Sequence, residues 1–308
     1  MKKIVGLLLI SILILSVFTW AGCSKSEPAT NQTGQQENKI DNSPMNLTLL
    51  GMSASGPGLM AMNGLAECIN KSYADSIVTI VPGNYGTNVS RINNNEADLA
   101  ITDNVFAVAA SKGQYPYDKK MDNMAAVAVL NPYVFQIVAD SDVGIDSIDE
   151  IIKNKMKIRI SIGLAGGAYP LFLNNYLAEY DLTIDDMSKW GCEIFNQGIN
   201  DSANMLADDR IDVFISSAMI PTSTIQELAQ SKEIVLLKMD PDVLDRLCEK
   251  HGYQEFVINK GVYGFVEENI LSIKTNSILI VSKDSPEEKV YKITHSIDSN
   301  LDYLKTVH

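Results

Sequence analysis

The side chains best suited to covalent chemistry lie in the stretch "GMSAS" at residues 51–55. This stretch differs by one residue from G-x-S-x-G, in which a serine on a strand-to-helix turn is the nucleophile of a hydrolase. Ser55 stands where the second glycine belongs, and the stretch follows the first predicted strand instead of a later one. We therefore expect a protein that is not an enzyme and has no catalytic residues. A surface serine hydrolase that uses Ser53 stays as the alternative.

Metal, cofactor and nucleic-acid chemistry have little support in the composition. The four cysteines, at positions 23, 68, 192 and 248, form no CxxC pair, and the three histidines form no HExxH motif. The formal net charge of −13 disfavours contacts with nucleic-acid phosphates. We expect no metal site, no cofactor and no nucleic-acid partner. Whether Cys192 pairs with Cys68 or with Cys248 stays open, because spacing alone does not set a disulfide.

Binding chemistry has more support, because small and polar residues recur where a predicted strand passes into a predicted helix. The first residues of a helix present unpaired N–H groups and the positive end of the helix dipole, which together suit a small anion. Six such loops stand out: "MSASGPG" (52–58), "PGNYGTN" (82–88), "TDNVF" (102–106), "LAGGAYP" (164–170), "NQGIN" (196–200) and "SSAMIPTS" (216–223).

These loops predict the residues that contact a ligand. Asp103 either binds an ammonium group or caps the next helix, and Tyr85 and Tyr169 either line a cleft or cover the edge of a lobe. The full predicted set is Ser53, Ala54, Ser55, Gly56, Asn84, Tyr85, Gly86, Thr102, Asp103, Gly166, Gly167, Ala168, Tyr169, Ser216 and Ser217.

The elements that must position these loops alternate between short apolar runs and helical patterns, which indicates an α/β fold. We predict strands at 47–50, 76–81, 97–102, 157–163 and 211–216. In open α/β sheets, ligands bind beyond the carboxyl ends of the strands, which is where the six loops lie.

The chain also repeats itself at a nearly constant offset. Gly51 plus 112 is Gly163, "GTNVS" (86–90) faces "GINDS" (198–202), and Asp98 faces Asp212 at an offset of 114. A common offset across three strand–turn–helix units predicts two similar lobes, each with a βαβαβ core and a ligand-facing edge.

Three further segments connect or close the lobes. Residues 125–140 hold two apolar runs around Asn131-Pro132, which fits a crossing into the second lobe, and 233–240 is expected to cross back. Residues 275–304 predict a strand and a closing helix with Pro286 at its first position. The expected boundaries are therefore 46–138 plus 238–308 for lobe 1 and 139–237 for lobe 2.

The N-terminus predicts export from the cell. Lys2 and Lys3 precede an apolar run, and Ala21-Gly22-Cys23 resembles a bacterial lipobox, in which the cysteine carries the lipid. We expect a signal peptide at 1–22 and a disordered, lipid-anchored tether at 23–45, whose polar composition cannot bury a core. The alternative is an uncleaved membrane helix. Both place the remaining chain outside the membrane.

The region from about Leu47 to Leu304 resembles the TAXI-type solute receptors of TRAP transporters. The resemblance rests on "VPGNYGTNVSRINNNEADLAITD", "SIGLAGGAYPLFLNNYLAEYDLTIDD" and, most specifically, "DDRIDVFISSAMIPTSTIQELA". It implies a two-lobed type II periplasmic-binding-protein fold, each lobe a mixed sheet flanked by helices, with a hinge between the lobes. The first loop and the 164–170 loop carry fewer hydroxyl side chains than is usual in that family.

The resemblance also implies a function. We expect a monomeric, extracytoplasmic receptor that captures a small carboxylate-bearing solute, similar to glutamate or 2-oxoglutarate, and delivers it to a Na⁺-driven TRAP membrane permease. A sensory lipoprotein with the same fold is the alternative that differs only in its partner.

Overall fold

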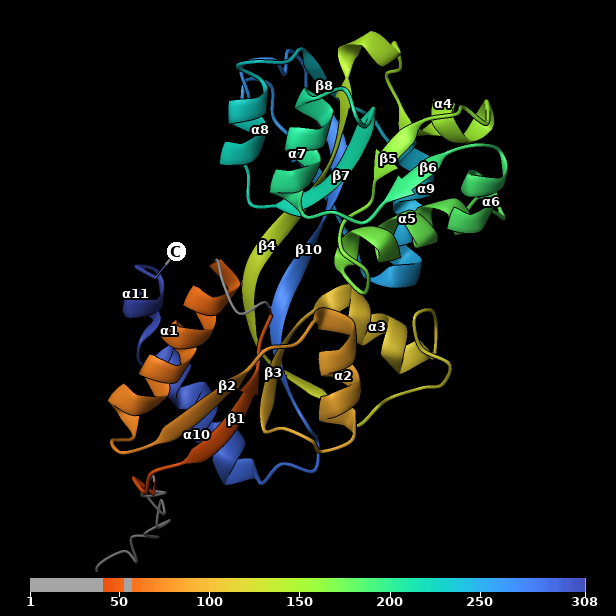
Figure 1. Ribbon diagram of the computed structural model, residues 1–308. Coiled ribbons are helices and arrows are strands. Elements are labelled where there is room, and N and C mark those ends of the chain that lie inside the picture. Colours follow the sequence, from red (N-terminus) through yellow and green to blue (C-terminus); the bar gives the residue numbers. More distant parts are fainter. Residues whose placement is uncertain (1–40, 53–56, 308) are drawn as a thin grey trace, which may run out of the picture. The chain divides into compact units, whose positions relative to one another are not determined.

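Two lobes share one sheet in the computed structural model of the protein (Figure 1), which describes residues 41–52 and 57–307. Two long strands run through both lobes, β4 (Ala125–Asp140) and β10 (Ile270–Val281). The expected signal peptide, Cys23 and most of the expected tether lie outside the described residues, as do Ser53, Ala54, Ser55 and Gly56.

Lobe 1 is built from the first part of the chain and its C-terminal helices. Its other elements are β1 (Asn46–Leu50), α1 (Pro57–Ser72), β2 (Ile77–Val81), α2 (Tyr85–Asn93), β3 (Leu99–Asp103), α3 (Asn104–Lys112), α10 (Glu287–Asp298) and α11 (Leu301–Leu304). Strand β1 pairs in parallel with β2 and β3, and β10 pairs antiparallel with β3 and β4. This gives the expected βαβαβ core with the return strand inserted beside it.

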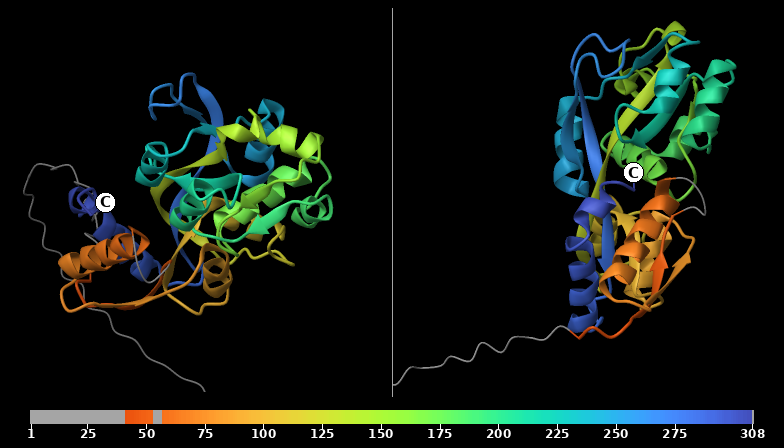
Figure 2. Two further views of the ribbon diagram at one scale, coloured as in Figure 1. Left: turned by 45° about the horizontal axis from the view of Figure 1, so that its top comes forward. Right: turned by 90° about the vertical axis from the view of Figure 1, so that its left-hand side faces the viewer.

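Alternate residues of the lobe 1 strands face two different helix layers, as the period of two in a strand requires. Leu49, Leu99 and Leu279 belong to one hydrophobic cluster with residues of α1 and α10. Leu50 and Ala100, their neighbours in sequence, belong to another cluster with residues of α2 and α3. Helices α1, α10 and α11 accordingly lie together on one side of the sheet (Figures 1 and 2).

Lobe 2 holds the middle of the chain. Its elements are η1 (Ser141–Val143), α4 (Ile148–Lys153), β5 (Arg159–Ser161), α5 (Ala168–Ala178), α6 (Ile184–Lys189), β6 (Glu193–Phe195), α7 (Ile199–Ala207), β7 (Val213–Ala218), α8 (Ser223–Leu228), β8 (Ile234–Leu236), α9 (Pro241–His251) and β9 (Gln254–Ile258). The sheet continues from β4 to β7, β5 and β6, with β8 against β4 and β9 against β10.

The repeat predicted from the sequence is visible in one hydrogen bond that both lobes make between an aspartate and a backbone N–H. The Asp98 carboxylate accepts a hydrogen bond from the backbone N–H of Thr48 at 2.7 Å, and the Asp212 carboxylate accepts one from the N–H of Arg159 at 2.7 Å. Each aspartate precedes the third strand of its βαβαβ unit and ties it to the start of the first. The two lobes therefore use the same residue type for the same strand connection.

The pairing of β4 with β10 is irregular where the two strands pass between the lobes. Pro132 lies opposite Asn276, and the register shifts between Asn276 and Ile278. Proline has no N–H to donate to a strand ladder, so the sheet is least constrained at this point. The Asn131-Pro132 break, expected between two apolar runs, lies inside one continuous strand.

The return to lobe 1 lies later in the chain than expected. Residues 233–240 do not cross back, because β8 pairs with the lobe 2 half of β4, Val138 opposite Leu236. Residues from Ile258 to Ile270 also join the hydrophobic cluster of lobe 2. The crossing is made by β10, so the boundary near residue 238 shifts into that strand. Pro286 is the N-cap of α10 and not its first residue.

Candidate functional site

A cavity of about 330 Å³ lies between the lobes at the carboxyl ends of their strands. Its volume is at the small end of the range for ligand pockets in proteins. Six lining residues come from lobe 1 and eight from lobe 2: Met52, Gly83, Asn84, Tyr85, Asp103 and Tyr133, then Leu164, Ala165, Gly167, Ala168, Tyr169, Gly198, Ile199 and Ser217.

The lobe 1 wall is aromatic and polar. Asn84 caps α2, with its side-chain oxygen accepting a hydrogen bond from the N–H of Thr87 at 2.9 Å. Tyr85 follows as the first residue of α2, and Tyr133 reaches the cavity from β4. Burial raises the pKa of Tyr85 well above its usual value, and the nearby Tyr133 and Asp103 add to the effect. Both phenols therefore stay neutral at physiological pH.

Asp103 is the charged group of this cavity among the described residues that line it. It ends β3 and caps α3, accepting hydrogen bonds from the N–H of Val105 at 3.1 Å and from the hydroxyl of Thr275 at 2.6 Å. Its side chain is only 1% exposed. Burial raises the pKa of Asp103 to about 7, although the two hydrogen bonds lower it. The residue thus both caps a helix and borders the cavity.

The lobe 2 wall consists of two helix N-termini without side-chain caps. Helix α5 begins after Gly167 and α7 after Gly198, and among the described residues no side chain accepts a hydrogen bond from the first turn of either helix. The orphan N–H groups of such a turn suit a carboxylate. Tyr169 in the first turn of α5 donates its hydroxyl to the carbonyl oxygen of Ser217 at 3.2 Å. The buried Ser217 hydroxyl has no hydrogen-bond partner among the described residues.

The two walls approach each other at the rim of the cavity. A Cβ added to Gly166 in lobe 2 would lie 3.8 Å from the side chain of Asn84 in lobe 1. Gly166 has φ +74°, a conformation that glycine adopts without strain. The glycine therefore serves the loop's turn and the approach of the lobes, and it does not line the cavity itself.

Three other predicted ligand contacts lie behind the cavity wall. The backbone at Gly86 packs against Phe106, which would be 3.3 Å from an added Cβ. Thr102 is buried and donates its hydroxyl to the carbonyl oxygen of Tyr85 at 2.9 Å. Ser216 is fully buried on the opposite face of β7 from Ser217. These residues support the site and do not border it.

Several cavity residues were not in the predicted set: Met52, Gly83, Tyr133, Leu164, Ala165, Gly198 and Ile199. All of them except Tyr133 belong to loops that the sequence singled out: Met52 in 52–58, Gly83 in 82–88, Leu164 and Ala165 in 164–170, and Gly198 and Ile199 in 196–200. Tyr133 had a weaker signal, an aromatic residue directly after the Asn131-Pro132 break in the crossing strand. The apolar members of those loops have no polar side-chain group that would have marked them as ligand contacts.

A second cavity of about 440 Å³ adjoins the first on the lobe 1 side. It shares Met52, Tyr85 and Tyr133 with the first cavity and is otherwise lined mainly by apolar residues of lobe 1, including Leu301 and Leu304. Since it is walled by one lobe, movement of the lobes does not enclose it. The cavity with polar groups from both lobes is therefore the candidate site.

Other features of the described residues bear on the expected partners. Residues 41–52 and 57–307 contain no cluster of acidic, histidine and cysteine side chains suited to a metal. Within the same ranges, no helix combines the length and the apolar character needed to cross a membrane. Cys68, Cys192 and Cys248 are all free thiols.

Comparison with known proteins places the fold. A TctC solute binding protein from Polaromonas aligns with a TM-score of 0.53 at 14% identity, over 86% of this chain and 87% of that one. The periplasmic binding protein BugD aligns with a TM-score of 0.49 at 17% identity, over 86% of this chain and 85% of that one. The two-lobed α/β architecture is that of the type II periplasmic binding proteins, as expected. Residues 51–308 match the NMT1-like family, and the chain belongs to that family.

Proposed function

We propose that this chain is the extracytoplasmic receptor of a TRAP-type transporter, of the TAXI kind. It captures one small solute with a carboxylate group, in the manner of glutamate or 2-oxoglutarate, and presents it to a membrane permease. The observation that carries the proposal is the cavity between the lobes, into which the uncapped helices α5 and α7 begin. The family, the fold and the motif resemblance support the same function.

The carboxylate binds to backbone N–H groups in this proposal. No Lys or Arg is among the described residues that line the cavity, so an anion there has no side-chain cation to pair with. Helix N-termini supply the charge complement instead, through N–H groups and the dipole. The Ser217 hydroxyl, which lacks a partner among the described residues, adds one further donor.

Closure of the lobes is the mechanism of capture. Bending at the irregular part of the β4–β10 pair, near Pro132, changes the distance between the walls without unfolding either lobe. A solute that contacts both walls binds the closed state better, and it shifts the population by that difference in affinity. The permease then distinguishes the closed from the open receptor.

The direct test is to identify the solute. We expect native mass spectrometry of the gently purified chain to show one small molecule per protein, and calorimetry to show binding of glutamate or another small carboxylate at micromolar affinity, about −8 kcal/mol. A chain that retains no solute and binds none of a broad panel of small metabolites contradicts the receptor proposal.

Membrane attachment has its own test. We propose that Cys23 carries the lipid, because Ala21-Gly22-Cys23 follows an apolar run. We expect Cys23→Ser to release the protein from the membrane or to leave its precursor uncleaved. A Cys23→Ser protein that matures and fractionates with membranes like the unchanged chain rules out the lipid anchor.

We also propose that the receptor does no covalent chemistry. The G-x-S-x-G pattern is incomplete at Ser55, so a fluorophosphonate probe should leave Ser53 unlabelled. Stoichiometric labelling that disappears in Ser53→Ala supports the hydrolase instead.

A further inference from the structure

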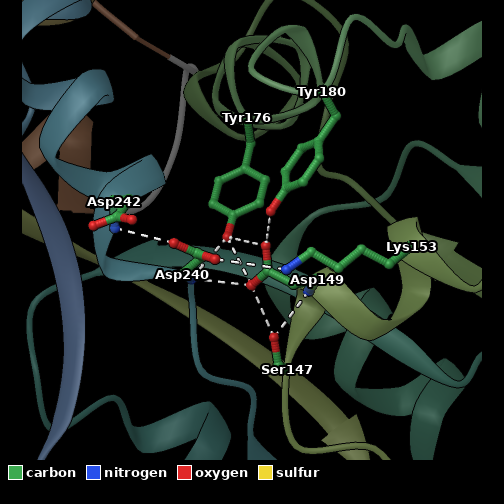
Figure 3. Close-up of polar contacts among 7 residues, drawn as sticks. All are labelled: Ser147, Asp149, Lys153, Tyr176, Tyr180, Asp240 and Asp242. Carbon is green, nitrogen blue, oxygen red and sulfur yellow. Dashed lines mark hydrogen bonds and ion pairs between the residues drawn. The ribbon is translucent and has the colours of Figure 1, made fainter.

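Two buried aspartates in this molecule differ in how their carboxylates are satisfied. Asp149 in α4 is 5% exposed and lies in lobe 2 beside α5 and the start of α9 (Figure 3). Its oxygens accept hydrogen bonds from the hydroxyls of Tyr176 at 3.0 Å, of Tyr180 and of Ser147 at 2.8 Å, and from the N–H of Asp240 at 3.0 Å. A carboxylate has about four acceptor sites, so Asp149 is saturated by the protein.

Asp103 is less completely satisfied. It accepts hydrogen bonds from Val105 and Thr275, one on each oxygen, and forms no ion pair with a Lys, Arg or His of the described residues. Acceptor capacity therefore remains on a carboxylate that is buried and borders the cavity. A buried charge in this state is costly unless something else pairs with it.

The surroundings of Asp103 favour a positive charge. Tyr85, Tyr133 and Tyr169 line the same cavity, and the faces of aromatic rings attract cations. The Asp103 carboxylate is close enough to raise the pKa values of Tyr85, Tyr133 and Tyr253 further, beyond the larger effect of burial. No basic side chain is among the described residues that line the cavity, so the protein leaves this negative charge uncompensated there.

We propose that the captured solute carries a positively charged nitrogen that pairs with Asp103 inside the cleft. The solute is therefore an amino acid or a related zwitterion, with its carboxylate at the helix N-termini of lobe 2 and its ammonium group at lobe 1. This inference rests on the proposed receptor function and narrows its substrate class. The Asp103 carboxylate serves as a binding group as well as the N-cap of α3.

The pH dependence of binding distinguishes a cationic group paired with ionised Asp103 from an anionic solute bound beside protonated Asp103. Asp103 has a pKa of about 7 in the empty site, so a cationic group binds its ionised form and binding tightens as the pH rises. A purely anionic solute needs Asp103 protonated and binds more tightly as the pH falls. The facing tyrosines, Tyr85, Tyr133 and Tyr169, have raised pKa values and stay neutral.

Two more distant groups complete the set of titratable neighbours. Tyr253, behind Asp103, also has a pKa raised by burial. His251 lies 6.5 Å from Tyr253, ring centre to ring centre, and burial lowers its pKa, so it is neutral above about pH 6.5. Between neutral and mildly alkaline pH, Asp103 is thus the group near the cavity that changes charge.

The experiment uses matched solutes that differ only in the amine. Calorimetry on the full chain, extracted in mild detergent, compares L-glutamate with glutarate and 4-aminobutyrate with pentanoate at about pH 6 and about pH 8.5. We expect the amine-bearing member to bind at least about ten-fold more tightly, with a preference that grows with pH. Any solute that co-purifies is identified by mass spectrometry and should contain a basic nitrogen.

The variant Asp103→Asn removes the charge and keeps the shape, since asparagine also caps helices. We expect it to lose the preference for the amine, while Asp98→Asn, the same change before the opposite end of β3, retains it. Equal or tighter binding of the amine-free member, tighter binding at low pH, or a co-purified solute without basic nitrogen overturns the proposal. The pH series on the unchanged chain decides even if Asp103→Asn does not fold. Absence of any bound solute contradicts the receptor function itself.

Discussion

The two walls of the cleft present opposite chemistry, although they belong to lobes built on the same repeat. In lobe 1, the helices that begin at the cavity are capped by side chains, α2 by Asn84 and α3 by Asp103. In lobe 2, α5 and α7 begin after Gly167 and Gly198 and have no side-chain caps. Helices α2 and α3 of lobe 1 therefore use side chains to cap their N-termini, and Asp103 also places a carboxylate at the cavity, whereas α5 and α7 of lobe 2 leave N–H groups open.

The framework beneath the walls has diverged much less. Asp98 and Asp212 make the same hydrogen bond to the first strand of their units. Gly51 and Gly163 both allow a helix side chain to lie against the backbone, because a Cβ added at either position would overlap the side chain of Met62 or Tyr169 respectively. The two lobes therefore share the contacts that connect their strands and differ in the residues that begin their helices.

Blocking the uncapped N-terminus of helix α7 in lobe 2 should have the largest effect on solute binding. A Cβ added at Gly198 meets nothing within 4 Å, and the φ of −66° suits any residue, so Gly198→Val should fold. Its side chain occupies the cavity beside α7, and we expect solute binding to fall at least about a hundred-fold, which is about 2.7 kcal/mol. Calorimetry with the solute identified by mass spectrometry measures this loss.

Gly264→Val is the matched control, because an added Cβ at that position also meets nothing within 4 Å. It lies outside the cleft and should bind like the unchanged chain. Gly167→Val is a poorer test, since its Cβ would lie 2.9 Å from the carbonyl oxygen of Leu164 and would strain the loop. If Gly198→Val binds the solute as tightly as the unchanged chain does, the solute does not bind at the N-terminus of α7.

The charge in the lobe 1 wall should be visible in the stability of the empty protein. Burial raises the pKa of Asp103 to about 7, so the folded chain holds this proton more tightly than the unfolded chain. Stability is therefore lost as the pH rises from about 4 to about 7. Between pH 5 and pH 7 we expect the unchanged chain to lose about 2 kcal/mol relative to Asp103→Asn.

Urea unfolding of the two ligand-free proteins across this pH range gives that difference. A stability difference between them that does not change with pH would show that Asp103 titrates in its ordinary range. In that case burial in the lobe 1 wall does not raise the pKa of Asp103, and the two walls differ less in charge than the structure indicates.

The aspartate contact that both lobes share predicts similar losses of stability when either aspartate is changed. Asp98→Asn and Asp212→Asn each weaken a charge-assisted hydrogen bond to a backbone N–H and an ion pair, with Lys289 and Arg159 respectively. Both groups are partly exposed, so we expect about 1.5 kcal/mol of destabilisation for each. Chemical unfolding checks this. If only one of the two variants is destabilised, the contact does not stabilise both lobes in the same way.

The smallest effect should come from the cap of α2. Asn84→Ala removes the acceptor of the Thr87 N–H hydrogen bond and should cost about 1 kcal/mol of stability. Asn84→Ser keeps a capping oxygen and should recover most of that loss in the same unfolding experiment. Equal stability of all three proteins indicates that this helix start needs no cap, as in lobe 2.

Much of the architecture followed from local patterns in the chain. The alternation of apolar runs and helices predicted the α/β fold, and the offset between Asp98 and Asp212 predicted two related lobes. Five predicted strands, at 47–50, 76–81, 97–102, 157–163 and 211–216, overlap β1, β2, β3, β5 and β7. These features depend on short-range periodicity and turn chemistry, which each segment carries by itself.

Contacts between distant segments decided the rest. Residues 233–240 have the apolar pattern of any strand, and only pairing with β4 shows that they stay in lobe 2. Ser216 and Ser217 are both polar residues near the end of a predicted strand, but β7 alternates its faces, so Ser217 borders the cavity and Ser216 is buried behind it. The sequence determined that two serines lie near the end of this strand. The tertiary structure decided which one borders the cavity, because the strand's pairing with β4 sets the direction of every side chain on it.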